Sequence, residues 1–256
     1  MRARFAAASA AAAVGLFLIL ILCLELGRNL GLMQTELVRS ETRAGVGVAD
    51  GVGSAVLALL LGFVFSGATA RFDQRRQLIV QQVNGIRSAW QRIDALPLDT
   101  QSDIRHDFRR FVDALVASYA NPAGSDPAAA VTRAREQVWS RSVAICITPD
   151  GERARMLVLP SLNEMFAAIE HERLARRIHP PAVIYAMLVL ASFVSALLAG
   201  YTIANTGTHN WLPEVAVAAI VSLVIYVIVQ IEYPRLGLVR LNDFDRALTE
   251  LRATMG

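Results

Sequence analysis

Apolar residues are concentrated in four long blocks of the chain, and the charged residues lie between these blocks. The blocks cover residues 5–26, 51–70, 182–203 and 214–231. A hydrocarbon core about 30 Å thick is crossed by roughly 20 apolar residues in a helix. Each block has about this length, and the pattern therefore predicts four transmembrane helices.

The first block could also belong to a cleaved signal peptide, because Arg2 and Arg4 precede it. A signal peptide has a shorter apolar region, followed by a cleavage site with small residues. Here the apolar run reaches Leu26 without an Ala-x-Ala site. This favours a retained helix.

The stretch after the second block is amphipathic. Ile79, Val83, Ile86, Trp90 and Ile93 recur at helical spacing, with polar residues on the other faces. No proline separates this stretch from the second block, so the two are predicted to form one long helix.

Three further helices are predicted before the third block. They cover residues 99–119, 128–147 and 152–178, and Pro160 is expected to kink or break the last of them. No alternating strand pattern is present, so the predicted class is all-α. The predicted domains are residues 1–70 and 182–233 as paired membrane helices, residues 71–181 as a cytoplasmic helical domain, and residues 234–256 as a cytoplasmic tail.

The arginine distribution predicts the orientation in the membrane. All 25 basic residues are Arg. The N-terminal four residues, residues 70–181 and the tail from residue 234 hold 2, 16 and 4 of them, 22 in total, whereas the two opposite loops hold 3. Positive charge marks the cytoplasmic side, so both termini and the middle domain are expected in the cytoplasm.

Composition and motifs argue against several kinds of chemistry. The formal charge is only +3, and acidic residues interrupt the arginine runs, so no nucleic-acid surface is indicated. Glu170, His171 and Glu172 are adjacent on a predicted helix and do not converge on one metal. We find no catalytic set, no metal-binding pattern and no cofactor motif, and we expect no enzyme.

The second block carries the candidate functional residues. Ala55, Leu59, Phe63 and Ser66 follow helical spacing and would form an apolar constriction if several copies surrounded an axis. The simpler alternative is that this face packs in a bundle or contacts lipid. The charges that bracket the block, Asp50 and Arg71, are candidates for the outer and inner mouths, although Asp50 could also pair with Arg43 at the interface.

Three stretches resemble the bestrophin-like family of prokaryotic membrane proteins, whose function is unassigned and which is distantly similar to bestrophin ion channels. The first runs from Leu61-Gly62-Phe63 to Arg71 and on to Arg76; the second joins Leu162-Asn163-Glu164-Met165 with His179-Pro180-Pro181; the third begins at Glu232-Tyr233-Pro234. The residues that carry the resemblance are Gly62, Phe72, Asp73, Arg75, Arg76, Asn163, Glu164, Pro181 and Pro234.

The resemblance implies a homopentameric channel for small inorganic ions in the inner membrane of a bacterium, with anions favoured over cations. Leu59 and Phe63 match bulky apolar neck positions of the animal channels, whereas Ala55 is smaller. The acidic run that binds Ca²⁺ in animal bestrophins is not found near the fourth block. The competing hypothesis is a non-conducting scaffold or signalling protein whose cytoplasmic helices bind a partner.

Overall fold

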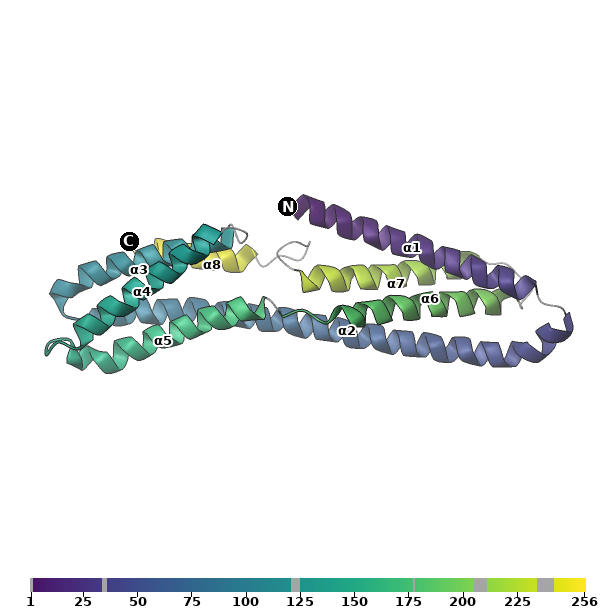
Figure 1. Cartoon of the computed structure of the whole chain (residues 1–256), viewed down its shortest axis with the longest axis horizontal. Helices are drawn as coiled ribbons and strands as arrows, with labels where there is room; N and C mark the ends of the chain where they lie inside the picture. Colours follow the sequence, from purple (N-terminus) through teal and green to yellow (C-terminus); the bar gives the residue numbers. More distant parts are fainter. Residues whose placement is uncertain (1, 34–35, 121–124, 177, 205–210, 234–241) are drawn as a thin grey trace. The chain divides into compact units, whose positions relative to one another are not determined.

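The computed structural model describes residues 2–33, 36–120, 125–176, 178–204, 211–233 and 242–256. Every regular element in these ranges is a helix, which confirms the all-α class (Figure 1). The elements are α1 (Arg2–Leu32), α2 (Glu36–Arg92), the short 3-10 helix η1 (Ile93–Ala95), α3 (Leu98–Ala120), α4 (Ser125–Cys146), α5 (Glu152–Ala175), α6 (Ala182–Ala204), α7 (Trp211–Glu232) and α8 (Asn242–Ala253).

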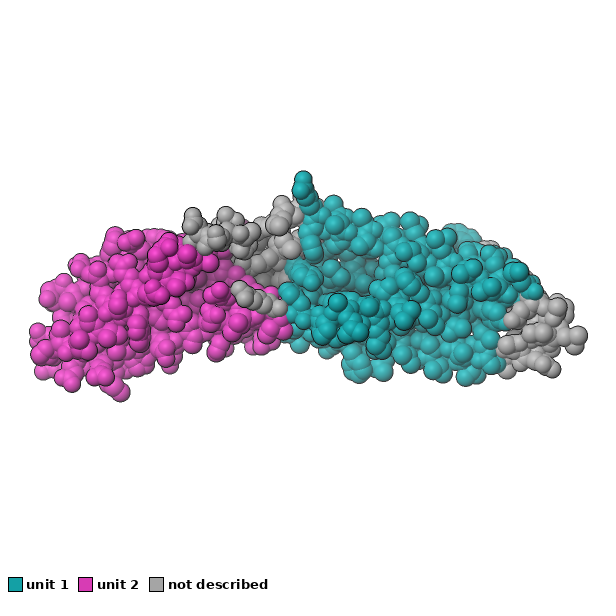
Figure 2. All heavy atoms as spheres, in the orientation of Figure 1, with its two compact units in different colours: residues 1–72, 179–240 teal, residues 73–178, 241–256 magenta. Residues whose placement is uncertain are grey.

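The chain forms two compact units (Figure 2). Unit 1 comprises Met1–Phe72 and His179–Arg240, and unit 2 comprises Asp73–Ile178 and Leu241–Gly256. The helix α2 contributes to both units and is continuous over 57 residues. The predicted single helix through the second block is therefore confirmed.

Within the described ranges, four helices are long and apolar enough to cross a membrane, as predicted. They include the four apolar blocks, and large apolar side chains are exposed on their outer faces, among them Leu18, Leu22, Leu59, Leu190, Ile220 and Leu223. Exposed apolar surface of this extent marks contact with lipid or with other protein. Unit 1 is therefore the membrane part of the molecule.

Small residues let α1 and α6 pack closely in unit 1. A Cβ atom on Gly200 would lie 1.9 Å from the Leu24 carbonyl oxygen, and one on Gly27 would lie 2.0 Å from the Leu197 carbonyl oxygen. Helices in lipid associate through such close backbone approach, because burial of apolar surface gives little advantage there. Glycine is therefore required at both crossing points.

The helix α7 also packs against α1. Leu20 and Leu24 of α1 are buried together with Ala218 of α7. Near the opposite end of α7, Gln230 donates a hydrogen bond of 2.9 Å from Nε2 to the Ser9 hydroxyl. A polar pair between two membrane helices stabilises their register, since neither group has water available in the hydrocarbon.

The core of unit 2 is aromatic. Phe108 and Phe111 of α3 are buried, and their rings lie in edge contact with a centroid distance of 6.2 Å. Phe166 of α5 packs on Phe111 at 5.6 Å, and Trp90 of α2 packs on Phe108 at the same distance. Edge and tilted contacts are the favoured geometries for such rings. One cluster thus joins α2, α3 and α5.

Pro160 was expected to kink or break the helix, and the break is wrong, because α5 continues through this residue. Proline removes the hydrogen bond to the carbonyl four residues earlier, here that of Met156. Met156 and Pro160 are both exposed on the same face of the helix. The freed carbonyl therefore lies on the solvent side, where its cost is small.

The predicted tail contains a helix that belongs to unit 2. Leu248, Leu251 and Met255 are buried in the core cluster of this unit. Arg252 binds Asp113 of α3 through two hydrogen bonds of 2.6 and 2.9 Å, and Arg109 donates to the carbonyl oxygen of Met255. Apolar side chains and ion pairs thus both hold α8 on α3.

Burial should matter more than the ion pair for the docking of α8. We expect Leu251→Ala to cost about 2–4 kcal/mol through the lost apolar contact. Arg252→Ala should cost less than about 1 kcal/mol, because Asp113 is solvent-exposed. Amide hydrogen exchange of residues 242–253 measures both effects. Equal loss of protection in the two variants would contradict this ranking.

Candidate functional site

The four predicted pore residues lie on the face of α2 that points away from its own bundle. Leu59 is 58% exposed and Phe63 is 67% exposed, and Ala55 and Ser66 are exposed as well. On the opposite face of α2, Leu57 and Ala68 are buried, and Gly53 lies against Ser195 and Leu198 of α6. The candidate residues thus share a face that the described part of unit 1 leaves uncovered.

Asp50 is turned partly toward its own bundle. Its half-buried carboxylate lies beside Ser54 on the next turn of α2 and beside Thr202 of α6. The side chain of Arg43, its alternative partner, lies outside the described residues. The structure therefore ties the candidate outer charge to the α2–α6 contact.

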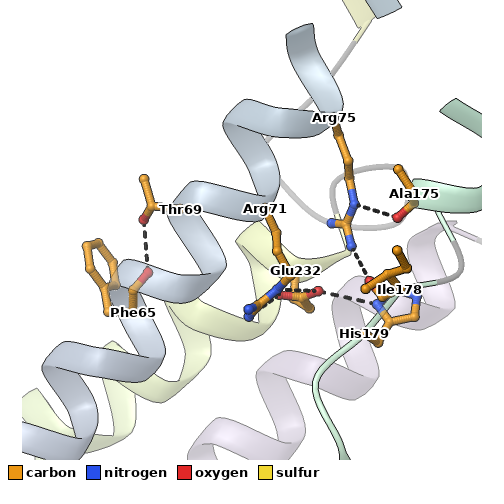
Figure 3. A network of polar contacts seen from close by, with 8 residues as sticks. All are labelled: Phe65, Thr69, Arg71, Arg75, Ala175, Ile178, His179 and Glu232. Atoms are coloured by element: carbon orange, nitrogen blue, oxygen red, sulfur yellow. Dashed lines mark hydrogen bonds and ion pairs between the residues drawn. The ribbon is translucent and has the colours of Figure 1, made fainter. Parts of the chain in front are cut away.

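Arg71, the candidate inner charge, is bound to a carboxylate. Its Nε lies 3.0 Å from Oε2 of Glu232 and 3.3 Å from Oε1, and its Nη2 lies 3.0 Å from Oε2 (Figure 3). The Glu232 side chain, at the end of α7, is completely buried. Arginine commonly binds a carboxylate through two N–H groups in one plane, and this bidentate geometry fixes the relative orientation of the two side chains. The pair therefore holds α2 against α7.

A histidine and two aromatic rings complete this site. Nδ1 of His179 lies 3.3 Å from Oε1 of Glu232 (Figure 3), and the ring of His179 is stacked on that of Tyr233 at 4.8 Å. Tyr233 also contacts Phe5 of α1, with centroids 5.7 Å apart. We call Arg71, His179, Glu232 and Tyr233 the inner cluster.

Sequence reasoning missed the partner of Arg71. Glu232 was named only as part of the third bestrophin-like stretch, and 161 residues separate it from Arg71. The sequence did contain a signal for this pair. Arg71 follows the second apolar block and Glu232 follows the fourth, and charged side chains near lipid usually pair with one another.

The bestrophin-like domain family matches residues 30–243. The chain belongs to the bestrophin-like family. Two solved structures share its fold. One is a membrane-protein mutant with 14% identity and a TM-score of 0.62, for which 93% of this chain and 98% of the other are covered. The other is a mutant bacterial bestrophin homologue from Klebsiella pneumoniae, with 16% identity, a TM-score of 0.58, and 91% and 99% coverage. No curated protein matches the chain.

The inner cluster joins all three stretches that carry the bestrophin-like resemblance. Arg71 comes from the first stretch, His179 from the second, and Glu232 with Tyr233 from the third. These stretches lie far apart in the sequence and meet at one end of the membrane helices. The motifs of this bestrophin-like chain therefore serve helix assembly at this point.

The other motif residues of this bestrophin-like chain are dispersed. Gly62, Asp73, Arg76, Asn163, Glu164 and Pro181 are exposed, Phe72 is half-buried, and Pro234 lies outside the described residues. Arg76 pairs with Asp73 at 3.7 Å. Arg75 is buried and donates from Nη2 to the Ile178 carbonyl oxygen at 3.0 Å (Figure 3).

A second buried polar network lies in unit 2. Gln82 of α2 donates to the Tyr119 hydroxyl at 2.6 Å, and this hydroxyl donates to Oε2 of Glu172 at 3.3 Å. Arg176 pairs with Glu172, and its guanidinium lies 4.2 Å from the Tyr119 ring centre. Because hydrogen bonds and an ion pair connect side chains of all three helices here, we interpret the network as a structural link among α2, α3 and α5. Among the described residues, no group of acidic, histidine and cysteine side chains could hold a metal ion.

Proposed function

We propose that this bestrophin-like chain assembles into a homo-oligomer that passes small inorganic ions through a pore lined by α2. A pentamer follows from the resemblance. The observation that carries the proposal is the uncovered apolar face with Ala55, Leu59, Phe63 and Ser66. An apolar ring at this face would gate by dewetting, because water leaves a narrow apolar constriction readily.

The charges at the two ends of the proposed pore segment, Asp50 and Arg71, should contribute little to ion selectivity. Arg71 is balanced by Glu232, and Asp50 is half-buried beside Ser54 and Thr202. A paired charge produces a weaker field than an isolated one. We therefore propose anions over cations on the family resemblance, and we do not assign the preference to either mouth charge.

For the location we propose the inner membrane of a bacterium, with both termini and unit 2 in the cytoplasm. The support is the arginine count on either side of the apolar blocks. Interspersed acidic residues do not alter this assignment, because the rule depends on the positive residues near the membrane.

Replacing Phe63 with alanine is expected to raise the unitary conductance severalfold. The substitution removes the most exposed aromatic side chain of the α2 face and widens an apolar constriction. The measurement is single-channel recording of the purified protein in planar bilayers, with its mass determined in mild detergent.

Phe65→Ala is the matched control, because Phe65 lies two residues away on the same helix and faces a different direction. Its conductance should equal that of the wild type. Absence of current with verified insertion, or a monomeric or dimeric mass, would contradict the channel proposal.

One observation favours a second candidate, a scaffold that binds a protein partner. Unit 2 exposes large apolar side chains at the start of α3, directly after α4 and in the first turns of α5: Leu98, Ile147, Met156 and Leu157. Such side chains are typical of a contact surface. A non-conducting protein of low oligomer number would favour this candidate.

A further inference from the structure

We propose that a groove between α2 and α6 binds one anionic phospholipid, with the phosphate at Arg71 and an acyl chain along the apolar wall. This inference goes beyond channel function and does not depend on conduction. It concerns residues of unit 1 only.

The groove has the composition of a lipid-binding site. Leu60, Val64 and Gly67 of α2 line one side, and Ile184 and Met187 of α6 line the other. Phe63 of the proposed pore face also borders the groove. Its volume is about 330 Å³, which is near the lower end of the range for ligand sites, roughly 300–1,000 Å³. This space suits part of one acyl chain. The remainder of the lipid would lie in the bilayer that surrounds these helices.

Arg71 is the charged residue among the groove-lining side chains. Glu232 engages its Nε and Nη2 atoms, whereas its Nη1 atom lies on the side of Gly67, 3.1 Å from the position of a Cβ atom there. A guanidinium has five N–H donors, so the Nη1 edge can bind a second oxygen anion while Glu232 holds the first edge. Gly67 leaves the room that this edge needs.

The exposure of the two charges favours an anion in the groove. Glu232 is completely buried, whereas 27% of the Arg71 side chain is exposed. An incoming phosphate therefore meets the cation first, and the carboxylate lies behind it. His179 contacts the same carboxylate, with its Nδ1 atom 3.3 Å from Oε1 of Glu232.

The position of Arg71 along α2 also fits a lipid headgroup. From Asp50 to Arg71 the helix rises about 31 Å, the thickness of the hydrocarbon core. Arg71 therefore lies at the level of the phosphates, and the apolar part of the groove lies at the level of the acyl chains. Basic residues at this depth on the cytoplasmic side bind anionic lipids.

The test is native mass spectrometry of the detergent-purified, delipidated protein after addition of phosphatidylglycerol or phosphatidylcholine with identical acyl chains. We expect the wild type to retain about twofold more phosphatidylglycerol than phosphatidylcholine. This is less than the roughly fivefold effect of an unpaired arginine near the surface, because Glu232 balances part of the Arg71 charge. The double variant Arg71→Gln/Glu232→Gln should bring this ratio close to one. It removes the cation without leaving a buried carboxylate unpaired.

Two further variants distinguish lipid binding in the groove from a general effect of positive charge on lipid retention. Met187→Trp should fill the groove from α6 and lower the retention of both lipids. Arg76→Gln removes an equal charge five residues further along α2, outside the groove, and should leave the ratio unchanged. Each variant is compared only at wild-type oligomer mass and melting temperature.

Equal retention of the two lipids by the wild type would overturn the proposal. So would a fall of the ratio in Arg76→Gln as large as in the double variant, or unchanged retention in Met187→Trp. The last result would indicate that a second copy of the chain covers the groove. Because the readout is bound mass, a failure here is distinct from a failure to conduct ions.

Discussion

Replacing Gly200 with alanine is expected to separate α1 from α6 and to destabilise the membrane unit strongly. The new Cβ atom would lie 1.9 Å from the Leu24 carbonyl oxygen and 2.7 Å from the carbonyl carbon. Both contacts are with backbone, so no side-chain rotation relieves them. We expect a cost of about 3 kcal/mol, the upper part of the range for overpacking. The apparent melting temperature, from size-exclusion chromatography of heated detergent-solubilised protein, should fall accordingly.

Gly15→Ala is the matched control for this prediction. Gly15 lies in the membrane segment of α1, and a Cβ atom there meets nothing within 4 Å. Alanine should be neutral or slightly stabilising, since glycine costs about 0.5–1 kcal/mol in a helix interior. Similar melting temperatures for Gly15→Ala and Gly200→Ala would show that α1 and α6 do not pack as described.

Arg71→Ala should be the most destabilising single removal of a charge. The substitution leaves the fully buried Glu232 carboxylate with only His179 from the inner cluster beside it. Breaking a buried pair on one side costs about 3–5 kcal/mol, because the remaining charge has lost both water and its partner. The melting temperature of the oligomer in detergent measures this loss.

A double-mutant cycle shows whether the effect belongs to the pair. Arg71→Gln/Glu232→Gln should recover most of the stability lost in Arg71→Gln, since no buried charge remains. Arg28→Ala is the control for an ordinary ion pair, because Arg28 and Glu25 are one helical turn apart and partly exposed. This variant should change stability by less than about 1 kcal/mol. Additive effects of Arg71→Gln and Glu232→Gln would contradict a direct interaction.

The membrane segments and the long second helix were predictable because both depend on local composition. Long apolar runs bounded by charges enter the lipid as helices, because a helix forms all its backbone hydrogen bonds within itself where no water is available. The absence of proline after Ala70 likewise indicated that the second span continues as a helix, as α2 does. Of the kink or break expected at Pro160, the break was wrong. The cost of a proline inside a helix depends on where the freed carbonyl lies, and this is a tertiary property.

The helix α8 was missed although its signal was present. Ala247, Leu248 and Leu251 follow helical spacing, but a short amphipathic segment after a loop has little stability of its own. Burial of Leu248 and Leu251 in the core of unit 2 provides the stability that helix propensity alone does not give. The contact partner, and not the segment itself, decides that this helix forms.

The candidate pore face was a prediction from spacing, and the conducting role of its residues stays a prediction. Helical spacing placed Ala55, Leu59, Phe63 and Ser66 on one face without indicating its direction. The structure directs this face away from the bundle of its own chain. Helical spacing shows which residues share a face but not which way that face points. The direction depends on the neighbouring helices, so only the packed structure supplies it.

The sequence by itself determined that the chain is helical, that four of its segments suit a membrane and that it resembles the bestrophin-like family. Those conclusions rest on composition, periodicity and short motifs, which are local properties. Only the tertiary structure decided that Arg71 binds Glu232, that Gly200 meets the backbone of α1 and that a groove opens beside Gly67. Each of these depends on atoms distant in the chain, and their distances follow from the packing of whole helices.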